Sequence, residues 1–205
     1  MLTKLKTTVE AWIRYEASIA HKAGFKPNHI SLLSLTFGLA SSFAYWLAGS
    51  SMPNLDFYRI YLISAFLLLL LSGFCDALDG ALARLYGEIT TMGGFLDSLL
   101  DRYVEATLFC GLMLSGLCDT FWGLLALVGS LLTSYARARS EAADVYMEKV
   151  GIFERAERLL LILVATLLNI FWFEALRYSV IILAFATNFT VLQRLYHFSK
   201  IATKR

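Results

Sequence analysis

Four aspartates interrupt the most apolar part of this chain. Asp76 and Asp79 closely follow the run FLLLLLSGF, and Asp97 and Asp101 come after a short polar connection, at the start of another apolar run. One ionised side chain at the centre of a membrane helix costs about 2.5–3.5 kcal/mol on insertion scales. Spacings of three and four residues place each pair on one helix face. We therefore expect consecutive helices to bring the four carboxylates together around compensating positive charge, most cheaply a pair of divalent cations.

Composition supports a membrane protein. Hydrophobic residues make up 58% of the 205 residues and the mean hydropathy is +0.63, whereas soluble domains are about 45–50% apolar. With two prolines and no low-complexity segment, residues 1–205 are expected to form a single domain. The three cysteines fit neither a zinc motif nor a disulfide framework. The net charge of +2 is small, and we expect no nucleic-acid partner.

The apolar runs predict an all-α polytopic protein with six transmembrane helices. An amphipathic helix over residues 1–23 is expected to lie in the membrane interface, with an ordinary solvated helix as the alternative. Lys26-Pro27-Asn28-His29 then redirects the chain into a bundle over residues 30–198. The expected spans are 30–48, Phe57 to the Asp76/Asp79 pair, 93–115, 121–135, 159–173 and 178–196, with a polar connection over 85–92.

Basic residues are distributed very unevenly about these spans. Arg59 and Arg177 are the two expected at the edge opposite the termini, and Arg102 and Arg194 fall within spans. The other lysines and arginines fall on the side of the termini and the aspartates. The positive-inside rule therefore places both termini and the carboxylate site in the cytoplasm of a multi-pass cell-membrane protein.

The aspartates belong to a longer pattern, D-x2-D-G-x2-A-R-x8-G-x3-D-x3-D, which runs from Asp76 to Asp101. This pattern resembles the signature of the CDP-alcohol phosphotransferases, six-span enzymes that attach a head-group alcohol to a lipid. The resemblance implies a homodimer that binds two divalent cations, Mg²⁺ or also Mn²⁺, through Asp76, Asp79, Asp97 and Asp101. It implies that Asp101 is the general base while a hydroxyl attacks the β-phosphorus and CMP leaves. It assigns contacts with the CDP-linked lipid to Asn28, Ser31, Asp76, Gly80, Ala83, Arg84 and Thr90, although many members have threonine in place of Ser31.

Two segments of the second half, SYARARSE and FERAER, resemble the inositol-phosphate branch of that family, the archaetidylinositol-phosphate and phosphatidylinositol-phosphate synthases. By this likeness, myo-inositol 1-phosphate is the acceptor, held by Arg137, Arg139, Arg155 and Arg194. Arg137 stands where bacterial members often have lysine. The alternative for each arginine is that it only enforces topology. Arg102 is expected to pair with Glu105 or with an acid of a neighbouring subunit.

Other functions fit parts of the same pattern. The acceptor in this family is alternatively glycerol 3-phosphate. A different class, a transporter with a carboxylate site, also places acids and arginines within spans, and aspartate-rich motifs bind prenyl diphosphates through Mg²⁺. The chain has a single glutamine, and scarcity of thermolabile amides favours a thermophilic, archaeal source and CDP-archaeol over CDP-diacylglycerol. The small-residue spacing Gly111–Ser115 is a candidate helix-pairing surface.

Overall fold

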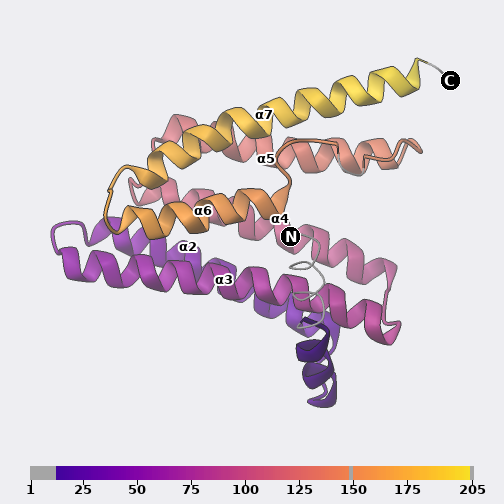
Figure 1. Cartoon of the computed structure of the whole chain (residues 1–205), viewed down its shortest axis with the longest axis horizontal. Coiled ribbons are helices and arrows are strands. Elements are labelled where there is room, and N and C mark those ends of the chain that lie inside the picture. The colour runs from indigo at the N-terminus through magenta and orange to yellow at the C-terminus, as the bar shows by residue number, and fades with distance from the viewer. Residues whose placement is uncertain (1–12, 148–149, 204–205) are drawn as a thin grey trace, which may run out of the picture.

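The computed structural model describes residues 13–147 and 150–203, and all regular structure in these ranges is helical. A helix over residues 13–22 precedes six longer helices (Figure 1). Their bounds are α2 Pro27–Ser50, α3 Leu55–Tyr86, α4 Thr91–Leu114, α5 Thr120–Glu141, α6 Arg155–Asn169 and α7 Ala175–Ala202. The first twelve residues of the predicted interfacial helix lie outside the described residues.

Two closely packed pairs, α2 with α3 and α5 with α7, form opposite sides of the bundle (Figure 1). α4 packs against α2 and α5, and α6 packs against α3 and α7, so these two helices join the pairs. Buried hydrogen bonds tie the layers together: the Tyr45 and Thr166 hydroxyls lie 2.6 Å apart, and Asn169 Nδ2 donates to the Tyr58 hydroxyl at 2.5 Å. These bonds satisfy polar groups that would be costly to leave unpaired in an apolar core.

Four helices are long and apolar enough to cross a membrane, namely α2, α3, α5 and α7, so the fold is that of a polytopic membrane protein. The other two predicted spans differ from these. α6 has 15 residues, or about 22 Å at 1.5 Å per residue, against roughly 30 Å of hydrocarbon. α4 carries four charged residues along its length, Asp97, Asp101, Arg102 and Glu105, and these lower its mean hydropathy.

α3 extends further than the sequence indicated. Asn54 caps its start by accepting hydrogen bonds from the backbone N–H groups of Asp56 and Phe57 at 3.1 and 3.3 Å. Its end is at Gly87, whose φ of 67° is the left-handed conformation that ends many helices. The helix therefore runs on past the Asp76/Asp79 pair, and the polar connection shortens from the expected 85–92 to 87–90.

The small residues of α4 are used within the chain. A Cβ at Gly111 would collide with the backbone carbonyl of Ser42 on α2, because the two helices approach closely there. The Gly111–Ser115 spacing, predicted as a candidate helix-pairing surface, therefore packs against α2 of the same chain at Gly111.

The helix of residues 13–22 lies at the end of the α2–α3 pair where α2 begins and α3 ends (Figure 1). Ala17 is buried against α3, in an apolar cluster that includes Ala81 and Leu82. The rings of His21 and Tyr86 stack with their centroids 3.6 Å apart. This short helix is therefore fixed to the same turns of α3 that carry Asp79, Gly80 and Arg84.

Candidate metal centre and substrate cavities

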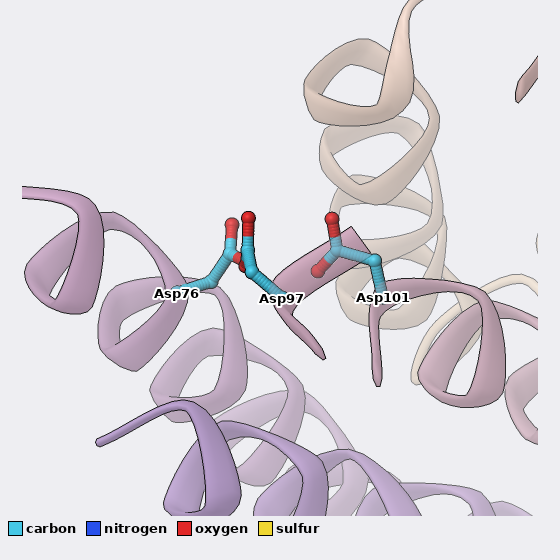
Figure 2. A group of neighbouring side chains, drawn as sticks. All are labelled: Asp76, Asp97 and Asp101. Carbon is cyan, nitrogen blue, oxygen red and sulfur yellow. The ribbon is translucent and has the colours of Figure 1, made fainter. Parts of the chain in front are cut away.

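Three carboxylates from α3 and α4 lie close together (Figure 2). Asp76 comes from α3, and Asp97 and Asp101 come from successive turns of α4. One oxygen of each lies within 4.8 Å of the others. Hard oxygen donors at this separation suit Mg²⁺, Mn²⁺ or Ca²⁺. The residues present therefore fit a divalent cation, held by Asp76, Asp97 and Asp101.

Asp79, the fourth predicted ligand, lies one turn further along α3. It is 4% exposed, and its Oδ2 accepts a hydrogen bond of 2.5 Å from the Ser31 hydroxyl of α2. Asp79 is not part of the group of three, but it lines a cavity together with Asp97. The structure thus brings three of the four predicted ligands into one cluster and places the fourth beside it.

The cavity beside Asp79 and Asp97 has a volume of about 300 Å³ and is here called the glycine-lined cavity. It contains six of the seven residues that the sequence pattern assigned to the CDP-linked lipid: Asn28, Ser31, Gly80, Ala83, Arg84 and Thr90, together with Gly93 and Gly94. The seventh, Asp76, belongs to the adjoining acid cluster. Residues from α2, α3 and the start of α4 therefore surround one space that opens onto the carboxylates.

Two residues of this cavity illustrate how the local sequence builds it. A Cβ added at Gly80 would lie 3.2 Å from Nη1 of Arg84, so the absence of a side chain lets the guanidinium lie over the helix backbone. Thr90 is the N-cap of α4 and accepts a hydrogen bond of 3.0 Å from Gly93 N–H. Thr90 therefore shapes the cavity by fixing where α4 begins, a role that the pattern did not predict.

A second cavity, of about 590 Å³, also reaches the acid cluster and is here called the arginine-lined cavity. Asp76 lines it, so the two cavities meet at the cluster. Its polar wall contains Arg102, Arg137, Arg155, Arg158 and Arg194. Its apolar wall comes from α3 and α6, through Leu69, Leu70, Phe74, Leu159, Leu160 and Leu163. A charged end and an apolar side in one cavity suit a ligand at the membrane surface.

Arg155 joins the arginine-lined cavity to the carboxylates. Its Nη1 lies 2.7 Å from Asp76 Oδ2 and its Nη2 lies 2.7 Å from Asp101 Oδ1. This guanidinium therefore bridges α3 and α4 from the first turn of α6. It stabilises two neighbouring negative charges that would otherwise repel each other in a partly buried setting.

The other predicted arginines lie in different surroundings. Arg137 lines the arginine-lined cavity and pairs with Glu141 at 2.9 Å. Arg139 lines a smaller cavity of about 240 Å³ between α5 and α7, away from the acids. Arg194 lines both the arginine-lined cavity and the smaller cavity between α5 and α7. It donates to the backbone carbonyls of Thr133 and Val150, at 2.5 and 2.9 Å. The structure thus brings Arg137, Arg155 and Arg194 together and leaves Arg139 on another face of α5.

Sequence reasoning missed the buried ion pair of Glu105 and Arg158. Both side chains are 4% exposed, and two bonds of 2.6 and 3.1 Å join them. The expected Arg102–Glu105 pair is wrong because Glu105 faces α6, while Arg102 donates to the Ser98 carbonyl at 2.6 Å and lies 3.5 Å from Asp101. The four-residue spacing of Asp97, Asp101 and Glu105 carried a signal, since it places all three on one face of α4.

Similarity to known proteins agrees with this geometry. The chain is 32% identical to the archaetidylinositol phosphate synthase of Pyrococcus horikoshii over 98% of its own length and 97% of the relative's. It is 36% identical to the Methanothermobacter thermautotrophicus protein of the same name, over 90% and 88% of the two chains. The crystal structure of Mycobacterium tuberculosis phosphatidylinositol phosphate synthase with CDP-DAG bound superposes with a TM-score of 0.77 at 28% identity, covering 91% of this chain and 92% of that one. A second structure of that enzyme, in complex with manganese and citrate, gives a TM-score of 0.76.

The family pattern named CDP-alcohol phosphatidyltransferase matches residues 25–192. This range holds the three clustered carboxylates, the whole lining of the glycine-lined cavity and Arg155. Both the match and the arrangement of these side chains lead to one assignment: the chain belongs to the CDP-alcohol phosphatidyltransferase family and is an enzyme of that class.

Proposed function

We propose that this enzyme transfers the lipid phosphate of a CDP-linked lipid to a hydroxyl of myo-inositol 1-phosphate and releases CMP. The observation that carries the proposal is the acid cluster between two cavities of different chemistry. The glycine-lined cavity offers close backbone approach and one guanidinium, which suits a nucleotide diphosphate. The arginine-lined cavity offers several guanidinium groups beside Asp76, which suits an acceptor that carries a phosphate of its own.

The donor's diphosphate is proposed to lie in the glycine-lined cavity, against Arg84 and the backbone near Gly80, Gly93 and Gly94. Arginine forms forked, charge-assisted hydrogen bonds with phosphate oxygens. Asn28 and Ser31 approach from α2, and Ala83 keeps the wall small. The apolar surface of α3 that continues into the bilayer leaves the lipid tails in the membrane while the nucleotide stays at its surface.

The acid cluster is proposed to hold two divalent cations, Mg²⁺ in the cell, with Asp79 completing the ligand set of Asp76, Asp97 and Asp101. Bound there, divalent cations would neutralise the negative charge that develops on the departing CMP. The carboxylates themselves keep the donor and acceptor on opposite sides of one group of oxygens.

Asp101 is the proposed general base. A new bond forms between the acceptor hydroxyl oxygen and the β-phosphorus, the bond from that phosphorus to the bridging oxygen breaks, and CMP departs with the bonding electrons. The hydroxyl proton passes to a carboxylate oxygen of Asp101. Asp101 suits this role because it contacts Arg155, a residue of the acceptor side, while its neighbour Asp97 lines the donor side.

The acceptor's phosphate is proposed to bind Arg137, Arg155 and Arg194. The names of the two archaeal relatives support inositol phosphate as the acceptor and an archaeol lipid as the donor, whereas CDP-DAG lies in the mycobacterial structure. Arg139 was expected in the same group, and its place in the cavity between α5 and α7 favours a more peripheral role.

The membrane arrangement proposed is six spans, with α4 and α6 as the two short or charged ones, and with both termini and the acid cluster cytoplasmic. Arg177 supports this orientation, since it pairs with Asp119 at 2.8 Å and with Glu174 at 3.1 Å at the opposite end of the bundle. A homodimer remains part of the proposal through the family resemblance.

The decisive experiment measures CMP release by the purified enzyme with each of two donors and several acceptors. CDP-archaeol and CDP-diacylglycerol are tested against myo-inositol 1-phosphate, glycerol 3-phosphate and free myo-inositol. Release that requires inositol 1-phosphate supports the proposal. Release with glycerol 3-phosphate instead assigns another acceptor in the same family, and substrate flux into liposomes without CMP release indicates a transporter.

Chelation tests the cation requirement. Treatment with EDTA should abolish CMP release, and Mg²⁺ or Mn²⁺ should restore it. Product formation that survives thorough chelation would contradict a role for the acid cluster in holding cations.

A further inference from the structure

Arg155 has two sets of potential partners. Its guanidinium is held by Asp76 and Asp101, two of the three carboxylates that fit a cation. The same side chain lines the arginine-lined cavity with Arg137 and Arg194. Within the described part of the chain, its buried Nε and Nη2 make no hydrogen bond, and Nη2 contacts Asp101 only as an ion pair, so the group is not saturated by its carboxylate contacts.

A guanidinium and a divalent cation compete for the same carboxylate oxygens. The negative charge of Asp76 and Asp101 is shared with Arg155 at 2.7 Å on each side. When these carboxylates bind a divalent cation, less of their charge remains for Arg155, and the repulsion between two nearby positive charges grows. Arg155 then needs another anion.

The arginine-lined cavity supplies the place for that anion. Arg158 is fully engaged with Glu105, and Arg194 donates to two backbone carbonyls, so both are fixed in position by the protein. Arg155 differs from them because its bonds go to groups that take part in ligand binding. A phosphate entering the cavity would accept hydrogen bonds from Arg155 once the carboxylates hold it less tightly.

We propose that Arg155 is the coupling residue of this site: it exchanges its carboxylate partners for the acceptor's phosphate when the acid cluster binds a divalent cation. The two binding events then favour each other, and linkage requires the effect to be equal in both directions. This inference rests on the proposed function, because it takes the arginine-lined cavity as the acceptor site.

The test measures binding in detergent-solubilised protein without donor, so no turnover occurs. Mn²⁺ affinity is measured by electron paramagnetic resonance of free Mn²⁺, in the absence of phosphate. Arg155→Gln should bind Mn²⁺ several-fold more tightly than the unchanged protein, because a rival cation is removed. Arg137→Gln is the matched control; Arg137 lines the same cavity but contacts Glu141 rather than the acid cluster, so its Mn²⁺ affinity should stay the same.

Calorimetry then measures the Kd of inorganic phosphate and of inositol 1-phosphate, with and without Mg²⁺. In the unchanged protein Mg²⁺ should lower either Kd by about tenfold, within the range of typical coupling. Arg137→Gln should bind both anions more weakly but keep that ratio. In Arg155→Gln the ratio should fall toward one. A ratio kept in Arg155→Gln would mean that the cation attracts the phosphate directly, and would overturn the proposal.

Two further arms keep the test decisive. Arg155→Lys retains the charge but loses the fork, so it should show a reduced ratio even if Arg155→Gln fails to fold; a ratio equal to that of the unchanged protein overturns the proposal. Inorganic phosphate that binds with coupling while inositol 1-phosphate does not bind would refute the proposed acceptor and support the coupling. Inositol 1-phosphate that binds equally with and without Mg²⁺ would support the proposed acceptor and refute the coupling.

Discussion

The glycine-lined and arginine-lined cavities meet at the same carboxylates but are built differently. The first is lined by α2, the C-terminal part of α3, the 87–90 connection and the start of α4, which follow one another in the chain. The second takes side chains from each helix from α3 to α7. Three helices that are consecutive in the chain therefore define the first cavity, whereas the packing of helices distant in the chain defines the second.

The arginines of the second cavity show what this difference means in practice. Arg158 and Arg194 make buried bonds to the protein itself, Arg155 bonds to the acid cluster, and Arg137 is 46% exposed at the cavity wall. These four arginines thus differ in role: two are held by the protein itself, one binds the acid cluster, and one is partly exposed. Single substitutions can therefore separate residues that serve the chemistry, the ligands or the fold.

The largest effect is expected at the cluster that both cavities share. Asp101→Asn removes the proposed base and one of three clustered carboxylates, and positioned bases contribute about 10²–10⁴-fold. CMP release should fall by roughly 10³-fold, while binding of the CDP-linked donor, measured at equilibrium, should change little because Asp79, Asp97 and Arg84 remain.

Asp119→Asn is the matched control for that variant. Asp119 is an exposed carboxylate that pairs with Arg177 at the far end of the bundle, at 2.8 Å. It should retain normal CMP release. Normal turnover in Asp101→Asn would show that the base has been assigned to the wrong residue.

Sequence alone predicted that Asp76, Asp97 and Asp101 lie together and named six residues that the structure places in the glycine-lined cavity, while the roles of these residues stay predictions. Asp97 and Asp101 are four residues apart on one helix, so helix geometry alone sets their relation, and the short polar connection brings them back to Asp76. The same reasoning predicted the positions of the helices to within several residues. It ended the second span at the Asp76/Asp79 pair, whereas α3 continues to Tyr86.

The arginine-lined cavity was harder to predict for a physical reason. Arg137 and Arg139 look equivalent in the sequence, but two residues on a helix of 3.6 residues per turn point about 200° apart. Whether Arg158 binds a ligand or a carboxylate depends on Glu105, which is 53 residues away in the chain. No local spacing encodes that contact, and the fold alone brings the two together.

The second largest effect should be on stability and not on ligands. Glu105→Gln leaves Arg158 buried without its carboxylate, and breaking a buried pair by removing one partner costs about 3–5 kcal/mol. Thermal unfolding in detergent should show a clearly lower Tm. Arg177→Gln, which breaks an exposed pair with Asp119, should change stability by at most about 1 kcal/mol. Equal shifts in the two variants would mean that the Glu105–Arg158 pair contributes no more than a surface contact.

A smaller, specific effect is expected on the donor side. Gly80→Ala places a Cβ 3.2 Å from the Arg84 guanidinium, a flexible group that can move. The donor KM should rise by about tenfold, the equivalent of one lost hydrogen bond to a charged group, with Tm unchanged or slightly higher because alanine favours helices. Gly73→Ala on the same helix meets nothing within 4 Å, so its donor KM should be unchanged. A similar donor KM in both variants would remove the argument that Gly80 makes room for Arg84.

The smallest effect separates two neighbouring arginines of α5. Arg137→Gln removes a partly exposed guanidinium from the arginine-lined cavity and should raise the acceptor KM about fivefold, or roughly 1 kcal/mol, as expected for a hydrogen bond made near solvent. Arg139→Gln alters the cavity between α5 and α7 and should leave the acceptor KM within about twofold, because the helix holds this side chain on another face. The donor KM, measured for both variants, serves as an internal control and should equal that of the unchanged enzyme. If Arg139→Gln raised the acceptor KM as much as Arg137→Gln, long-range charge rather than contact would explain both effects. Because salt screens such charge, the acceptor KM of both variants would then approach that of the unchanged enzyme at high salt.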